Sequence, residues 1–150
     1  MKKVLLLSFL LFFSAVCFSQ SLKDLYGKWS EVNKKGLGSF TFFPEGYAMI
    51  MQGENMVDGR NYSITEGPYK GNKGHIKYTV DFINKPHKVK LTVSYNDGEK
   101  EIELNDFLEG FIEFVKEDEM LFFLDFDKEK PEKLDPLSPN TIILKRESTL

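Results

Sequence analysis

Cysteine is almost absent from this sequence: Cys17 is the only one, and it lies in an apolar segment near the N-terminus. From residue 18 onward, the chain therefore has no disulfide, no thiol nucleophile and no thiolate metal ligand. Histidine is also scarce, with only His75 and His87. Two histidines without a third ligand do not make a zinc site, so we expect surface histidines and no bound metal.

An excess of basic residues is missing as well. The chain has 20 basic and 23 acidic residues and a formal net charge of −3. Proteins that bind nucleic acid do so mainly through Lys and Arg residues that neutralise phosphates. We therefore expect no nucleic-acid partner.

Sequence signatures of catalysis are also lacking. We find no G-x-S-x-G turn around a nucleophilic serine and no glycine-rich phosphate loop. The acidic run Asp125, Asp127 and Glu129 resembles the start of a calcium loop, but Lys130 occupies the position that needs glycine for the sharp turn. We predict no enzymatic activity and no cofactor.

The one long apolar run, residues 4–16, directly follows Met1, Lys2 and Lys3. It is too short to span a bilayer, which needs about 20 apolar residues. A basic start, an apolar run and small residues before Gln20 predict a secretory signal peptide over residues 1–19.

The remaining residues, 20–150, are expected to form one periplasmic or secreted domain, without stable membrane insertion after cleavage. One alternative stays open. Cys17 would be the lipid-anchored residue of a lipoprotein signal, although Val16 stands where such signals have a small residue.

Short alternating segments separated by turn residues make up the rest of the chain. The clearest is residues 75–83, where apolar and polar side chains alternate strictly. Residues 96–98, Asn-Asp-Gly, are a strong hairpin signal. Helical character is limited to residues 21–25, with Ser21 as N-cap and Asp24 as its partner. The pattern predicts an all-β domain, a single antiparallel up-and-down barrel of about 8–10 strands with a short N-terminal helical turn.

Toward the C-terminus we expect separate strands over residues 99–104 and 111–115, and a looser stretch with three prolines over residues 128–140. Large apolar side chains on the predicted strands are candidates to line a ligand cavity: Phe42, Met49, Met51, Tyr62, Tyr78, Phe82, Phe114 and Phe123. A barrel of about eight strands is just wide enough to be filled by side chains or to hold one small ligand, so both interpretations stay open.

Residues 25–29, Leu-Tyr-Gly-Lys-Trp, resemble the Gly-x-Trp opening of lipocalin-like barrels, and residues 42–46 and 143–146 resemble the hairpin and closing strand that follow in small secreted bacterial members. The chain is therefore similar to the small secreted bacterial lipocalin-like (calycin-type) domains. The resemblance implies that Trp29, after Gly27, closes one end of the barrel and that Arg146 packs on the indole.

We accordingly expect an exported, monomeric barrel without catalysis that binds a small hydrophobic or amphipathic molecule. The alternative is a protein-interaction or inhibitor-like module with a filled barrel. Such a module would act through its acidic loops, especially residues 128–140.

Overall fold

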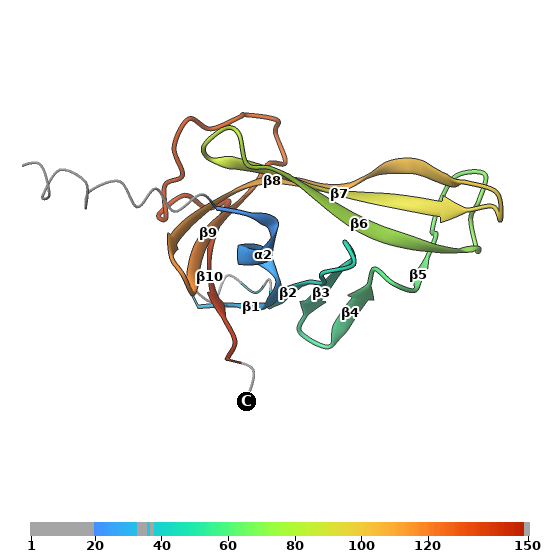
Figure 1. The fold of residues 1–150 in the computed structure, drawn as a ribbon, viewed down its shortest axis with the longest axis horizontal. Helices are drawn as coiled ribbons and strands as arrows, with labels where there is room; N and C mark the ends of the chain where they lie inside the picture. The colour runs from blue at the N-terminus through green and yellow to red at the C-terminus, as the bar shows by residue number, and fades with distance from the viewer. Residues whose placement is uncertain (1–19, 33–35, 37, 149–150) are drawn as a thin grey trace, which may run out of the picture.

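The computed structural model describes residues 20–32, 36 and 38–148, so the predicted signal peptide lies outside the described residues. Figure 1 shows that the regular structure is nearly all β, with one short helix, α2. The described chain has no helix of sufficient length and apolar character to cross a membrane. The predicted all-β antiparallel barrel with an N-terminal helical turn is confirmed.

Helix α2 (Leu22–Leu25) is a single turn held at both ends. At its start, the Ser21 backbone N–H donates to the Asp24 carboxylate at 2.7 Å, which is half of the predicted capping box. Leu25 is completely buried, and Gly27 (φ +111°) then turns the chain into the first strand. The positive φ explains why glycine stands at this position.

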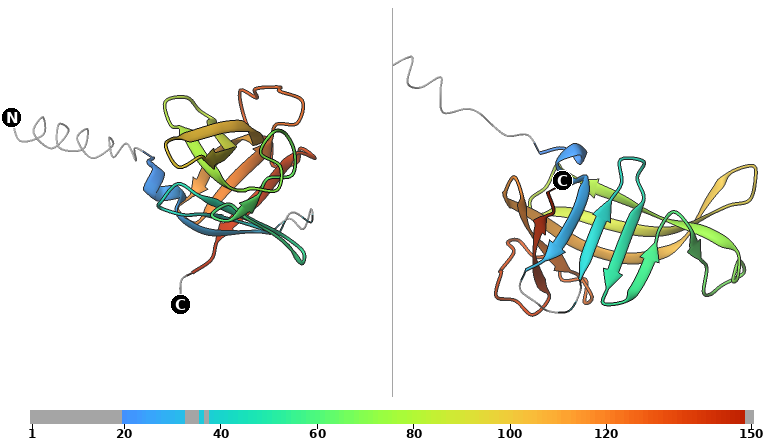
Figure 2. Two further views of the ribbon diagram at one scale, coloured as in Figure 1. Left: turned by 90° about the vertical axis from the view of Figure 1, so that its right-hand side faces the viewer. Right: turned by 90° about the horizontal axis from the view of Figure 1, so that it is seen from below.

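Ten strands follow in one antiparallel sheet, in the order β4-β3-β2-β1-β10-β9-β8-β7-β6-β5. Pairing of the first strand with the last brings the two ends of the domain together. Figure 2 shows β1 to β4 side by side across one side of the barrel. The strands are β1 (Gly27–Glu31), β2 (Ser39–Phe42), β3 (Ala48–Gln52), β4 (Asn55–Asp58), β5 (Tyr62–Ser63), β6 (Lys73–Asp81), β7 (His87–Asn96), β8 (Glu101–Lys116), β9 (Glu119–Leu124) and β10 (Thr141–Arg146).

The barrel nearly closes where the ends of β3 and β4 meet β6. The backbone N–H of Tyr78 donates to the Gly46 carbonyl at 2.9 Å, and that of Ile76 donates to the Gly59 carbonyl at 2.7 Å. A Cβ atom on Gly59 would lie 2.1 Å from the Ala48 carbonyl oxygen. Only glycine therefore permits this close approach of three backbone segments.

Strand β8 spans 16 residues, where the sequence pattern predicted two separate strands. Its residues 101–112 pair with β7, but the register shifts between Leu91 and Thr92 and again between Val93 and Ser94. Such bulges bend a strand and increase its twist. Beyond them, residues 92–106, called here the projecting hairpin, extend past β3 and β4 (Figures 1 and 2).

The core lies inside the barrel, where aliphatic side chains surround five aromatic ones: Trp29, Phe40, Phe42, Tyr78 and Phe122. Ring centroids lie 5.1 Å apart for Phe40 and Phe122, and 5.1 Å apart for Phe42 and Tyr78, with the planes steeply inclined. Edge-to-face pairs contribute about 0.5–1.5 kcal/mol beyond the apolar area they bury. These rings therefore hold opposite walls of the barrel together.

A second apolar cluster lies on the outer face of the sheet. It is formed by Phe111, Leu121 and Phe123 together with Leu134, which is only 3% exposed. Leu134 comes from the loop after β9, orange-red in Figure 1, so this loop covers the outer face of the sheet. Strand β9 is consequently buried on both faces.

Candidate functional site

One end of the barrel, here called the closed end, is formed by Trp29, Arg146 and α2. Trp29 and Arg146 are direct partners across β1 and β10. The Cζ atom of Arg146 lies 4.3 Å from the centroid of the indole, so the contact that the resemblance implies is present. The indole N–H also donates to the Leu25 carbonyl at 2.8 Å. Trp29 is therefore covered on its outer side and satisfied in its hydrogen bonding.

The Arg146 guanidinium joins four segments of the chain. Beyond its contact with the indole, it donates hydrogen bonds to the backbone carbonyls of Tyr26, Asp24 and Glu117. These carbonyls belong to α2, its C-terminal cap and the turn between β8 and β9. The Arg146 guanidinium thus donates to backbone carbonyls that have no strand partner, and it closes this end of the barrel.

The interior of the barrel is packed rather than hollow around four large side chains. Trp29, Phe42, Phe122 and Leu91 have 0% exposed surface. A side chain without accessible surface touches no space that a water-sized sphere could enter. Phe42, expected to line a cavity, is thus a packing residue of the filled centre.

Tyr78 is the polar group of this interior. Its hydroxyl donates to the Phe43 carbonyl at 2.8 Å, and its ring is 5% exposed. Burial raises the pKa of the Tyr78 hydroxyl far above its ordinary value, and the nearby Tyr26 and Glu45 raise it further. The hydroxyl therefore remains a protonated hydrogen-bond donor.

Three further predicted cavity residues, Phe114, Phe82 and Tyr62, are only half-buried. Phe114 packs edge-on against the Trp29 ring at 5.9 Å. Phe82 lies outside the core cluster, 5.0 Å from the ring of His87. Tyr62 lies in a different part of the barrel, 5.9 Å from the ring of Phe107. The structure therefore does not bring these three residues to one place.

Three predicted cavity residues lie on the outer face, contrary to expectation. On β3, Ala48 and Ile50 pack in the core, so the alternating Met49 and Met51 point away from it. Phe123 belongs to the outer cluster under Leu134. Both strands carry apolar residues on each face, and alternation alone does not decide which face is inside.

The expectation of two surface histidines holds for His75, which is half-exposed, and is wrong for His87. His87 is 2% exposed, and its ring nitrogens lie 2.7 Å from the Asn84 carbonyl and 2.6 Å from Oε1 of Gln20. It therefore ties the start of the described chain to the turn between β6 and β7. Its neighbours are amide oxygens, which suits a structural role.

On β3, β4, β5 and β8, apolar side chains pack on the core and keep part of their surface exposed. We call this set the open-end rim: Ile50, Val57, Tyr62, Phe107 and Leu108. Ile50 and Val57 are direct partners across β3 and β4, and Tyr62 contacts Phe107. Of these five residues only Tyr62 was predicted. Phe107 and Leu108 were missed because the bulges of β8 break the alternation around residues 107–108.

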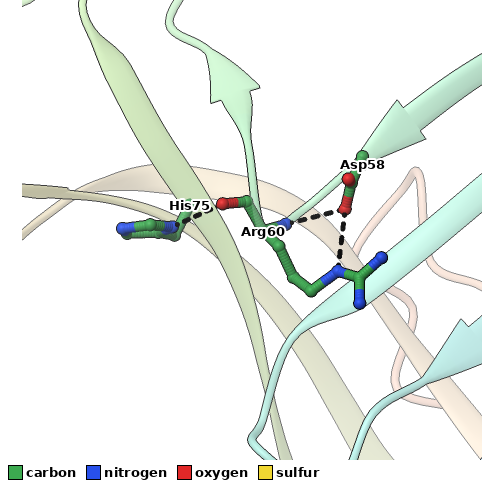
Figure 3. A network of polar contacts seen from close by, with 3 residues as sticks. All are labelled: Asp58, Arg60 and His75. Carbon is green, nitrogen blue, oxygen red and sulfur yellow. Dashed lines mark hydrogen bonds and ion pairs between the residues drawn. The ribbon is translucent and has the colours of Figure 1, made fainter.

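A polar network lies outside the barrel at the closure between β4 and β6 (Figure 3). The Nδ1 atom of His75 lies 3.2 Å from the Arg60 carbonyl, so this nitrogen carries the proton and donates. Arg60 in turn donates its backbone N–H to Asp58 at 3.0 Å and stacks its guanidinium on Phe43 at 4.2 Å. These contacts hold the chain around Gly59 in place.

No protein-family model matches the chain, and neither the curated proteins nor the solved structures contain a match. Among residues 20–32, 36 and 38–148, no group of three or more His, Cys, Asp or Glu side chains is placed to hold a metal ion.

Proposed function

We propose that this domain binds one small apolar or amphipathic molecule at the open-end rim. A single contrast carries the proposal: rim side chains pack on the core and still expose apolar surface, whereas side chains at the filled centre expose none. Small-molecule sites are mostly apolar with a few polar groups. Tyr62 supplies such a group, because its hydroxyl lies at the surface beside Thr65.

The proposal also includes a lipocalin-like family for the domain and its export from the cytoplasm. A nearly closed barrel of ten antiparallel strands, with Arg146 over the indole of Trp29, supports a lipocalin-like assignment. The basic start and short apolar run of residues 1–19 support export. On this proposal the exported barrel carries no catalysis.

A protein-interaction module is the second candidate, and a specific observation favours it. The centre of the barrel is filled, and the loop over residues 125–140 exposes two large apolar side chains, Phe126 at 65% and Leu137 at 88%. Exposed apolar residues beside acidic ones are typical of protein-binding surfaces. On this candidate, the loop rather than the rim is the contact surface.

Titration with an apolar fluorescent probe such as ANS separates the two candidates. We expect saturable binding at one probe per chain, weakened on the order of tenfold in Tyr62→Ala and in Phe107→Ala, since each removes an aromatic wall of the rim. Phe126→Ala is the matched control and should leave the affinity unchanged. An equal loss in Phe126→Ala, or no saturable binding, would contradict the rim site.

Export is tested separately, by N-terminal sequencing of the protein recovered from outside the cytoplasm. We expect a mature chain that begins at Gln20. A chain that retains Met1, or one that begins at a lipid-modified Cys17, would contradict ordinary signal cleavage.

A further inference from the structure

Three methionines lie together on the outer face of the hairpin formed by β3 and β4. The sequence has five methionines, and Met1 lies outside the described residues. Met120 is completely buried in the core. The other three, Met49, Met51 and Met56, fall within eight consecutive residues, and none of them belongs to the core or to the outer cluster.

The strand register brings the three side chains within reach of one another. Met51 and Met56 are direct partners across β3 and β4, and Met49 is two residues from Met51 on the same face. Directly opposed Cβ atoms in an antiparallel pair lie about 4.5–5.5 Å apart, and diagonal neighbours about 7–8 Å. Residues i and i+2 of a strand lie about 6.8 Å apart. Because methionine has three rotatable side-chain bonds, the three sulfur atoms can converge on one point.

Packing in the core or in the outer cluster does not account for methionine at these positions. Met56 is 58% exposed, whereas Met49 and Met51 are partly buried. The register partners of Met49 and Met51 on β2 are the polar residues Thr41 and Ser39, of which Ser39 is itself buried. One exposed and two partly buried thioethers, outside both apolar clusters and beside polar residues of β2, are therefore a feature that these clusters do not explain.

We propose that Met49, Met51 and Met56 form a site for a soft monovalent cation, with Cu(I) as the ion that their chemistry selects. Thioether sulfur is a soft, uncharged ligand that prefers Cu(I), whereas Ca²⁺ and Mg²⁺ require oxygen ligands. No cysteine occurs from residue 18 onward, so methionine is the only soft sulfur ligand in this part of the chain.

Charges beside the site are compatible with a cation. Asp58 is the register partner of Met49, and its carboxylate lies 3.4 Å from Nε of Arg60. The ion pair leaves little net charge next to the sulfur atoms, so neutral ligands and a single positive charge suit the position. The site lies outside the barrel and is independent of ligand binding at the open-end rim.

The test is titration of the protein with Ag(I), a redox-stable soft ion, followed through the methionine ε-methyl NMR signals. Cu(I) is then titrated in competition with a chromophoric chelator. We expect one bound ion per chain. The signals of Met49, Met51 and Met56 should shift on binding, and that of buried Met120 should not.

Substitutions with leucine keep the volume and remove the sulfur. Met51→Leu and Met56→Leu are each expected to weaken Ag(I) and Cu(I) binding by about 10-fold to 100-fold or more, the range found when even outer-shell partners of a metal site are lost. Met120→Leu is the matched control and should leave the affinity unchanged. Circular dichroism of all three variants checks that the fold is retained.

Three outcomes would overturn the proposal: no saturable Ag(I) binding, equal losses in Met120→Leu and Met51→Leu, or Zn²⁺ binding as tight as Cu(I) binding. If the wild type does not bind Ag(I), and a protein partner binds this hairpin equally well in the wild type and in Met51→Leu, the methionines form an apolar docking surface instead.

Discussion

The closed end and the projecting hairpin are stabilised by different kinds of contact. At the closed end, Trp29 has no exposed surface and is held by Arg146 on its face and by the Leu25 carbonyl. On the projecting hairpin, Tyr95 is half-buried and stacks on Tyr69 with ring centroids 4.6 Å apart. The contact at Trp29 is therefore fully buried, whereas the contact at Tyr95 is partly exposed to solvent.

Ion pairs do not distinguish the two regions, because Lys28–Glu147 beside the closed end, at 3.0 Å, is exposed as well. Two residues of the projecting hairpin form short but exposed ion pairs: Glu101 with Lys77 at 2.7 Å and Asp106 with Lys90 at 2.7 Å. The side chains of both pairs are more than one third accessible. Exposed pairs contribute little stability because solvent screens them. We infer that the closed end carries most of the free energy of unfolding and that the projecting hairpin opens first.

The largest expected effect comes from Trp29→Ala. Removal of a completely buried indole from a filled core costs about 3–5 kcal/mol of unfolding free energy. Tyr95→Ala, the counterpart on the projecting hairpin, should cost about 1 kcal/mol, because the ring is half-exposed. Urea unfolding followed by far-UV circular dichroism measures both, and equal losses would contradict the inferred distribution of stability.

Gly59→Ala tests the closure between the two sides of the barrel. Its new Cβ would lie 2.1 Å from the Ala48 oxygen and 2.6 Å from the Ile76 oxygen, and such overpacking costs about 1–3 kcal/mol. Hydrogen exchange of the Ile76 and Tyr78 amides should accelerate, because these amides bond across the closure. Gly53→Ala is the control: its Cβ would meet open space, and the strain of a side chain at φ +60° is confined to the turn between β3 and β4, so the exchange of both amides should be unchanged.

Arg146→Met keeps most of the packing of the side chain and removes its charge. We expect a loss of about 1–2 kcal/mol, from the cation–π contact and from backbone carbonyls left without a donor. Unfolding monitored by Trp29 fluorescence measures the loss. Lys145→Met, at the exposed neighbouring position, is the control, and a comparable loss there would argue against a specific role for Arg146.

The smallest effect concerns pH and the projecting hairpin. Hydrogen bonds from Lys77 and Ser94 lower the pKa of Glu101 from its ordinary value of 4.5. A lowered folded-state pKa means that the contribution is complete above about pH 4.5 and is lost as the pH falls through the folded-state pKa. Because the pair is exposed, Glu101→Gln should cost less than about 1 kcal/mol at neutral pH.

The measurement for Glu101→Gln is urea unfolding across the acid range. The difference between wild type and variant should shrink toward zero as the pH falls. Glu103→Gln, an exposed neighbour on β8, is the control. A difference that grows toward acid pH would contradict the sign of the effect.

Much of the fold could be predicted because the signals are local. Residues 75–83 alternate strictly, and β6 (Lys73–Asp81) indeed buries Ile76 and Tyr78 on one face. The Asn-Asp-Gly turn joins β7 to β8 as predicted, and the Ser21–Asp24 pair starts α2. Each of these features depends on residues that are near one another in the sequence.

The candidate site was predicted only in part, because its geometry depends on distant contacts. The bulges that place Phe107 and Leu108 at the open-end rim arise where β8 pairs with β7. Met49 and Met51 were assigned to the interior because β3 is apolar throughout. Pairing of Ile50 with Phe40 and Val57 shows instead which face of β3 is inside.

Residue pattern alone was thus sufficient for the antiparallel all-β architecture and its main turns, since period-2 alternation and turn chemistry are properties of short segments. The contact between Trp29 and Arg146 was expected only from the resemblance to lipocalin-like barrels. Tertiary contacts decided which face of β3 and β9 points inward. On β9 both faces are apolar, and only the loop that carries Leu134 makes the outer one a buried surface. A strand that is apolar on both faces contains no information about its own orientation, so its neighbours in the folded barrel must supply it.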